Sequence, residues 1–218
     1  MSNQCDILII EDEPSVSRAV EMICDEEGMS VIAVDNAAEA INTLEHTQFR
    51  LALCDIMMQG MDGFRFLEEL DNRGLNTPVV MMTGYSTMEN AVKSLFLGAV
   101  DYIPKPFTAD ELLTVIRRSL RSSILRDKAH APQLNGDRTL SFVPTPLEFH
   151  RLGYVSWVRM EDEGTARIGV SDLFLKSVEG IQAFELSTVG EELVQGVPCA
   201  VATSSRGAEH GIMCPMSG

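Results

Sequence analysis

Short apolar runs alternate with amphipathic stretches through the first half of the chain, to about residue 121. The runs are, in order, CDILII, SVIAV, LALCD, PVVMMT and VDYI, and the stretches after them repeat their apolar positions with the period of a helix. Strand and helix thus alternate five times. Because parallel neighbours need a helical crossover, this alternation predicts an α/β fold with a doubly wound parallel sheet covered by helices on both faces.

The pattern changes beyond residue 122. Residues 123–147 hold three prolines and no sustained period, which predicts a linker, although its first part is also compatible with an extension of the preceding helix. The later runs YVSWVRM, TARIGV, IQAFEL and CAVA are separated by glycines and acidic turns, a pattern typical of a small β sandwich or barrel. We therefore expect a first domain at residues 1–122 and a β-rich domain at residues 148–218.

Composition and charge narrow the range of functions. The net charge of -15 would repel a polyanion, so we expect no DNA partner. No stretch approaches the roughly 18 apolar residues of a membrane-spanning helix, and the start MSNQCDILII lacks the basic flank of a secretion signal, so we expect a cytoplasmic protein without a membrane partner. The cysteines are scattered and lack C-x-x-C spacing, which favours reduced structural thiols over a disulfide framework or a zinc site. They are Cys5, Cys24, Cys54, Cys199 and Cys214.

Polar side chains follow four of the predicted strands. Glu11 and Asp12 come after the first apolar run, Asp55 ends the third, Thr83 ends the fourth, and Lys105 comes just after the fifth. Ligand sites in open parallel sheets lie beyond the carboxyl ends of the strands. We therefore expect these five side chains to gather on one rim of the sheet.

Three carboxylates on one rim require a counter-ion, and a hard cation with oxygen ligands such as Mg²⁺ fits them best. With the metal bound, an ionised Asp55 can attack phosphorus and form an aspartyl phosphate. Lys105 would supply an ammonium to the transferred group, Thr83 a hydroxyl, and the backbone near Ile56 and Gly84 amide donors. The rim therefore predicts phosphoryl transfer to Asp55.

The motifs IIEDEP, CDIMMQGMDGF, MMTGY and GAVDYIPKPF carry these residues in that order. Together they resemble the receiver domain of two-component response regulators, over residues 5 to about 122. The resemblance implies a flavodoxin-like (βα)5 fold. It also implies that the phosphoryl group comes from a phosphohistidine on a sensor histidine kinase or a phosphotransfer protein, and that the chain is no enzyme beyond catalysing its own phosphorylation and dephosphorylation.

The metal set that the resemblance implies comprises Glu11, Asp12, Asp55 and Met57, with Mg²⁺ as the cofactor. We interpret the thioether side chains of the methionines around the site, that of Met57 included, as core or loop filling and not as metal ligands. They are Met57, Met58, Met61, Met81 and Met82. Two positions depart from the family pattern: Gln59 stands where the loop usually has proline, which changes loop stiffness, and Glu11 replaces the commoner aspartate but keeps a carboxylate.

The resemblance also implies how phosphorylation acts on the domain. Thr83 and Tyr102 would form a switch pair, with plain strand packing as the alternative role of Tyr102. The peptide bond before Pro106 would be cis. Family members signal through the fourth helix, fifth strand and fifth helix, here roughly residues 87–121, and this face would bind an unidentified output protein or a second copy of the chain as a homodimer.

The second half, from about Phe149 to Gly218, is similar to the glycine-cleavage H protein, a lipoyl carrier of the biotinyl/lipoyl barrel superfamily. The similarity rests on WVRMEDEGTARIGVSD and VGEELVQGVPCAV, and it implies a partial lipoyl-type barrel. In that family a hairpin lysine carries lipoate through an amide, but here Arg206 or Gly207 falls at the tip. A guanidinium cannot form that amide and Lys176 lies far from the hairpin, so we expect no lipoate.

The hairpin has two interpretations. It is either a plain turn or a docking surface on which Arg206 or His210 contacts a partner. Because the family's hairpin lies midway through the barrel, a chain ending at Gly218 would lack the closing strands, whether because the sequence is part of a longer protein or because something else covers the open edges. We expect the tail to be poorly ordered or strand-paired with a neighbour.

These features predict a response regulator in which phosphorylation of Asp55 switches a protein-interaction surface. Its second half would be a non-enzymatic interaction module derived from a lipoyl carrier. The alternative is a carrier or regulator of glycine or lipoate metabolism that a receiver domain controls. A transcription regulator would need a helix-turn-helix or ATPase segment after the receiver, and we find none in the sequence.

Overall fold

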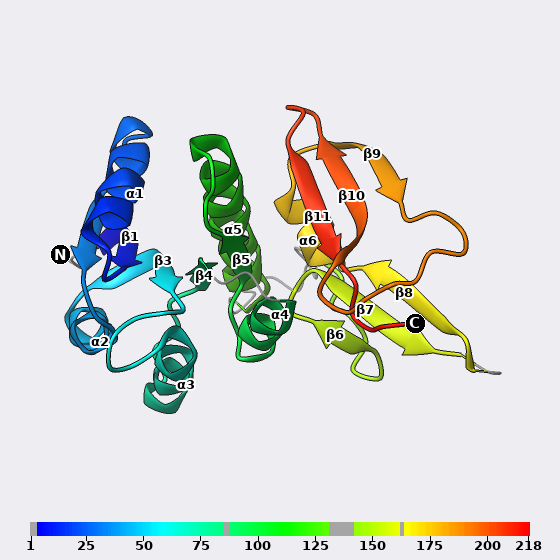
Figure 1. Ribbon diagram of the computed structural model, residues 1–218, viewed down its shortest axis with the longest axis horizontal. Coiled ribbons are helices and arrows are strands. Elements are labelled where there is room, and N and C mark those ends of the chain that lie inside the picture. Colours follow the sequence, from blue (N-terminus) through cyan, green and yellow to red (C-terminus); the bar gives the residue numbers. More distant parts are fainter. Residues whose placement is uncertain (1–3, 85–87, 131–141, 162–163) are drawn as a thin grey trace, which may run out of the picture. The chain divides into compact units, whose positions relative to one another are not determined.

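Five parallel strands form one sheet in the N-terminal half of the computed structural model, which describes residues 4–84, 88–130, 142–161 and 164–218 (Figure 1). The strand order is β2-β1-β3-β4-β5, and it places β1, β3 and β4 in the interior of the sheet. The strands are β1 (Gln4–Ile10), β2 (Val31–Val34), β3 (Gln48–Asp55), β4 (Val79–Thr83) and β5 (Asp101–Pro104). Interior parallel strands are covered on both faces, which explains why their sequences are continuous apolar runs.

Helices follow every strand and cover both faces of this sheet. α1 and α5 lie on one face, and α2, α3 and α4 lie on the other (Figure 1). Among the described residues, side-chain caps begin three of these helices, since Asn36 accepts a hydrogen bond from the Glu39 N–H, Asp62 one from the Arg65 N–H and Thr108 one from the Glu111 N–H. The helices are α1 (Pro14–Glu26), α2 (Ala37–His46), α3 (Gly63–Arg73), α4 (Met88–Phe96) and α5 (Ala109–His130).

The core of this half is formed by the central strands. The side chains of Ile7 to Ile10 on β1 and of Leu51 to Cys54 on β3 are fully buried, and Phe66 of α3 packs into the same cluster from one face. Burial of such runs on both faces is the main stabilising contribution to the unit. The expected doubly wound, flavodoxin-like α/β fold is confirmed for this half.

The helix after β5 is longer than the sequence pattern indicated. α5 runs from Ala109 to His130, so it continues past residue 122, where we placed the end of the first domain. The chain divides into two compact units, Met1–Leu120 and Arg121–Gly218. Residues 131–141 of the expected linker lie outside the described residues.

Strands dominate the unit Arg121–Gly218, which contains two three-stranded antiparallel sheets, in the orders β6-β7-β8 and β11-β10-β9. Buried apolar side chains, including Phe174, Ala202 and Ile212, form its core. The expectation of a β-rich second domain is confirmed, whereas a lipoyl-type barrel stays a prediction. The elements are β6 (His150–Leu152), β7 (Ser156–Met160), β8 (Ala166–Val170), α6 (Asp172–Ser177), β9 (Ile181–Leu186), β10 (Pro198–Ser204) and β11 (Glu209–Met213).

Trp157 on β7 occupies a fixed place in the first of these sheets. Its indole N–H donates a hydrogen bond to the Val170 carbonyl at 3.1 Å, and its ring lies against Gly169 of the neighbouring strand. A Cβ atom at position 169 would come within 2.1 Å of the ring, so glycine is required there for the tryptophan ring to pack against this strand.

Among the described residues, no helix has the length and apolar character needed to cross a membrane.

Candidate functional site

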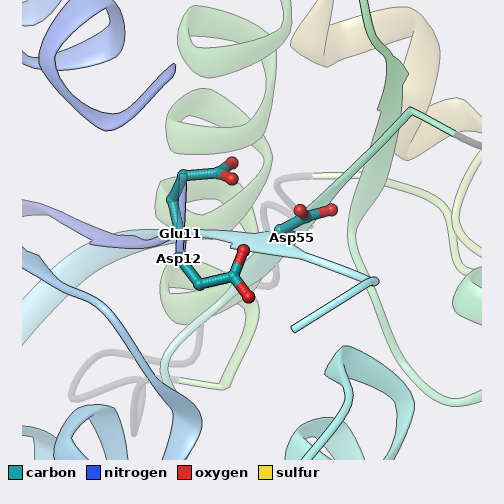
Figure 2. Close-up of side chains that lie close together, drawn as sticks. All are labelled: Glu11, Asp12 and Asp55. Atoms are coloured by element: carbon teal, nitrogen blue, oxygen red, sulfur yellow. The ribbon is translucent and has the colours of Figure 1, made fainter. Parts of the chain in front are cut away.

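Three carboxylates meet where β1 and β3 end. Glu11 and Asp12 directly follow β1, Asp55 is the last residue of β3, and the two strands are neighbours in the sheet. One oxygen from each carboxylate lies within 4.8 Å of one from each of the other two. Figure 2 shows the three side chains close together at the ends of the two strands. The parallel topology therefore brings together acids that lie more than forty residues apart in the sequence.

Lys105, which follows β5, holds two of these carboxylates. Its Nζ lies 2.5 Å from Glu11 Oε2 and 3.0 Å from Asp55 Oδ2. Only 14% of the lysine side chain is exposed, and the side chains of Glu11 and Asp55 are 0% and 8% exposed. Because charges this buried require a partner, the ammonium partly neutralises the cluster.

Burial and pairing act on these charges in opposite senses. Burial raises the pKa of Glu11, and the Lys105 ammonium opposes that shift. Burial lowers the pKa of Lys105, but its hydrogen bonds to the Glu11 and Asp55 carboxylates outweigh this and raise the pKa above the ordinary value. Lys105 is therefore a permanent cation at neutral pH.

The loop that follows β3 contacts the cluster through its backbone. The Met57 N–H donates to Asp55 Oδ1 at 3.3 Å, and the Gln59 N–H donates to Asp12 Oδ2 at 3.1 Å. The Met57 side chain is 55% exposed, which fits a loop position and not the core. No sequence pattern indicates either amide contact, since any residue except proline could donate it.

The proposed switch residues lie on the two neighbouring strands. Thr83 is buried at the end of β4, where its carbonyl accepts a hydrogen bond of 2.7 Å from the Lys105 N–H. Tyr102 on β5 is half-buried against the core, and burial raises its pKa. The peptide bond between Lys105 and Pro106 is cis. Thr87, the first residue of the expected signalling face, lies outside the described residues.

The donor set fits a hard divalent cation. Three carboxylates and one ammonium leave an excess of two negative charges at the rim, which equals the charge of Mg²⁺. Carboxylate oxygens are the ligands that Mg²⁺ prefers in proteins, whereas the thioether of Met57 is a soft donor that suits it poorly. The carboxylates of Glu11, Asp12 and Asp55 are thus a side-chain set that fits the metal, and the expected part of Met57 in the metal set stays a prediction.

The hairpin of β10 and β11 in the C-terminal unit bears the two residues considered for docking, Arg206 and His210. Arg206, between β10 and β11, pairs with Glu179 at 3.1 Å, and both side chains are more than half exposed. His210 on β11 is only 5% exposed and packs edge-on against Phe174. His210 is therefore not placed to contact a partner, which removes one of the two residues that we considered for docking. Lys176 lies on α6, where it pairs with Asp172 at 3.0 Å.

Comparisons with known proteins agree with the geometry of the rim. Residues 7–117 match the family described as response regulator receiver domain. The uncharacterized transcriptional regulatory protein YkoG of Bacillus subtilis is 35% identical over 117 residues, which are 54% of this chain and 51% of that protein. The DNA-binding transcriptional regulator NtrC of Escherichia coli is 31% identical over 133 residues, 61% of this chain and 28% of that protein. The solved receiver domain of NtrX from Brucella abortus is 36% identical and covers 53% of this chain and 98% of its own, with a TM-score of 0.50.

The expectation that DNA is excluded as a partner is wrong. The chain spans about half or less of these curated relatives, and one of them is named a DNA-binding regulator. Repulsion between like charges depends on the surface that meets the phosphates and not on the charge summed over a chain. The net charge of -15 therefore does not decide the question.

Proposed function

The chain belongs to the response regulator receiver family, and from that premise we propose that its N-terminal unit accepts a phosphoryl group on Asp55 from a phosphohistidine of a sensor kinase or a phosphotransfer protein. The observation that carries the proposal is the position of the Asp55 carboxylate. It lies at the strand-end rim with the Lys105 ammonium 3.0 Å away and two further carboxylates beside it. An aspartate with only a structural role would not need this arrangement.

In the transfer, an oxygen of Asp55 attacks the phosphorus atom of the donor. The new O–P bond forms as the P–N bond breaks, and the electron pair of that bond returns to the imidazole nitrogen, which takes up a proton. Lys105 faces the developing negative charge from one side and the Thr83 end of β4 adjoins it. Bound magnesium would neutralise charge on the phosphoryl oxygens, and Glu11 and Asp12 would hold it. We assign the receiver no catalysis beyond its own phosphorylation and dephosphorylation.

The change in charge at Asp55 would reach the rest of the unit through Thr83 and Tyr102. Thr83 pairs with Pro104 of β5, and Met81 of β4 pairs with Tyr102, so a movement of Thr83 would act directly on β5. Tyr102 is half-buried and packs against the core of the unit. This switch would alter what the face formed by α4, β5 and α5 binds.

Phosphorylation can be tested by intact-mass measurement. We expect the wild-type chain, incubated with acetyl phosphate and Mg²⁺, to gain one phosphoryl group, and Asp55→Asn to gain none. Asp35→Asn is the matched control, because Asp35 also follows a strand of the sheet, is exposed, and has no ion pair among the described residues. Modification of Asp55→Asn to the wild-type extent would refute the assignment.

We propose that the C-terminal unit serves as the output module and carries no lipoate. Lys176 is the only lysine after residue 130, and its ammonium pairs with Asp172 on α6, whereas the hairpin itself bears Arg206. A lipoyl mass shift on the purified protein would overturn this and favour a carrier in glycine or lipoate metabolism.

A further inference from the structure

The backbone of the loop between β3 and α3 donates a hydrogen bond to a side chain at the end of β1. The Gln59 N–H donates to Asp12 Oδ2 at 3.1 Å and joins residues 47 positions apart. The base of the loop is closed separately, because the Gly63 N–H donates to the Ile56 carbonyl at 2.9 Å. The contact with Asp12 is therefore not needed to hold the loop shut.

Asp12 is the least anchored of the three carboxylates. Glu11 and Asp55 each accept hydrogen bonds from the Lys105 ammonium and from a backbone amide. Within the part of the chain that the structure describes, Asp12 has the Gln59 amide as its donor and no ion pair. It is also the most exposed of the three, so the surrounding packing does not fix its side-chain rotamer.

The bond uses the backbone of Gln59 and leaves its side chain unused. Every residue except proline carries this N–H, so the contact exists here because position 59 is not proline. A carboxylate has two oxygens, and the amide occupies one of them. The other oxygen stays available to a cation.

We infer that the backbone amide of Gln59 positions Asp12 for magnesium binding. The amide holds the carboxylate beside Glu11 and Asp55 before the cation arrives, so that binding does not have to restrict a freely rotating side chain. This role rests on the magnesium site of the proposed function and adds a positioning group to it. Partners that orient metal ligands in this way typically change metal affinity by a factor of about 10 to 100 when they are removed.

Titration calorimetry of the full chain with MgCl₂ tests the inference without measuring phosphorylation. We expect Gln59→Pro, which removes the N–H, to bind Mg²⁺ about tenfold more weakly than the wild type, the lower end of that range because the site of contact is exposed. Gln59→Ala keeps the N–H and should bind within about twofold of the wild type. Equal weakening in both variants would overturn the inference, as would wild-type affinity in Gln59→Pro.

A double-mutant comparison separates positioning of Asp12 from a general effect of proline on the loop. In an Asp12→Ala background there is no carboxylate to orient, so Gln59→Pro and Gln59→Ala should bind Mg²⁺ with equal, reduced affinity. A further loss caused by proline in that background would mean that it acts through the loop, and the inference would be wrong. Far-ultraviolet circular dichroism of all variants shows whether each one is folded.

The same titration distinguishes this inference from the proposed function. A wild-type chain that binds Mg²⁺ and loses affinity only in Gln59→Pro, yet gains no phosphoryl group, would support the positioning role and refute the acceptor role. A wild-type chain that is phosphorylated on Asp55, with equal Mg²⁺ affinity in the wild type, Gln59→Pro and Gln59→Ala, would support the acceptor role and refute the positioning role.

Discussion

Lys105 is the residue on which the charge balance of the rim depends. Its ammonium lies within 3.0 Å of two buried carboxylates, and removing it would leave Glu11 and Asp55 facing each other without compensation. Loss of one partner from a buried ion pair typically costs about 3 to 5 kcal/mol, because the remaining charge stays buried and unpaired.

We therefore expect Lys105→Met to lower the free energy of unfolding of the N-terminal unit by about 3 kcal/mol in the absence of divalent cations. The loss should shrink when Mg²⁺ is added, since the cation would replace the missing positive charge. Urea unfolding followed by circular dichroism measures both effects. Arg18→Met is the control, because Arg18 is exposed on α1 of the same unit and its substitution should change stability by less than about 0.5 kcal/mol.

At the scale of elements, α5 is fixed to the start of β5 by one buried ion pair. The Arg118 guanidinium donates to Asp101 Oδ2 through Nε at 2.8 Å and through Nη2 at 2.5 Å, and both side chains are 12% exposed. The neighbouring Arg117 pairs with Glu27 at the surface, where the two side chains are 52% and 37% exposed. Adjacent arginines on one helix thus make one buried and one exposed pair.

This contrast gives a matched pair of variants. We expect Arg118→Met to destabilise the N-terminal unit by about 3 kcal/mol, because it leaves Asp101 buried and unpaired. Arg117→Met should cost less than about 1 kcal/mol, since solvent screens an exposed pair. Denaturant midpoints of the two variants provide the comparison, and equal midpoints would show that the buried pair does not anchor α5.

The elements also show what the sequence could and could not predict. The strand-end acids were predictable because parallel topology alone places Asp12 and Asp55 on one rim. The length of α5 was not: residues 109–130 contain neither glycine nor proline, so nothing local ends the helix at residue 122, and the serines there are only weak helix breakers. The hydrogen bond from the Gln59 N–H to Asp12 could not be predicted either, because it depends on how a loop lies beside the end of a strand that is distant in the sequence.

For the molecule as a whole, cation binding at the rim should appear as added stability. A ligand that binds only the folded state stabilises it by about 2.7 kcal/mol at a hundredfold excess over its dissociation constant. For a unit of this size that raises the unfolding temperature by roughly 10 °C. We expect this increase with MgCl₂ in a calorimetric scan and its loss in Asp12→Ala. NaCl at equal ionic strength controls for screening, and an equal shift with that salt would argue against a specific site.

The C-terminal unit resisted prediction for a different reason. Apolar runs located its strands, and the strands pair with their neighbours in sequence, but the break between β8 and β9 that separates the two sheets is decided by tertiary packing. The sequence therefore placed the strands without grouping them into the sheets β6-β7-β8 and β11-β10-β9.

The packing of the Trp157 ring against Gly169 has a practical consequence for studying this protein. Trp157 is the only tryptophan in the chain, so the receiver contains no indole and the fluorescence of this ring reports on the C-terminal unit alone. A change in its emission after acetyl phosphate is added would record, without any label, the arrival in the second unit of a signal that begins at Asp55.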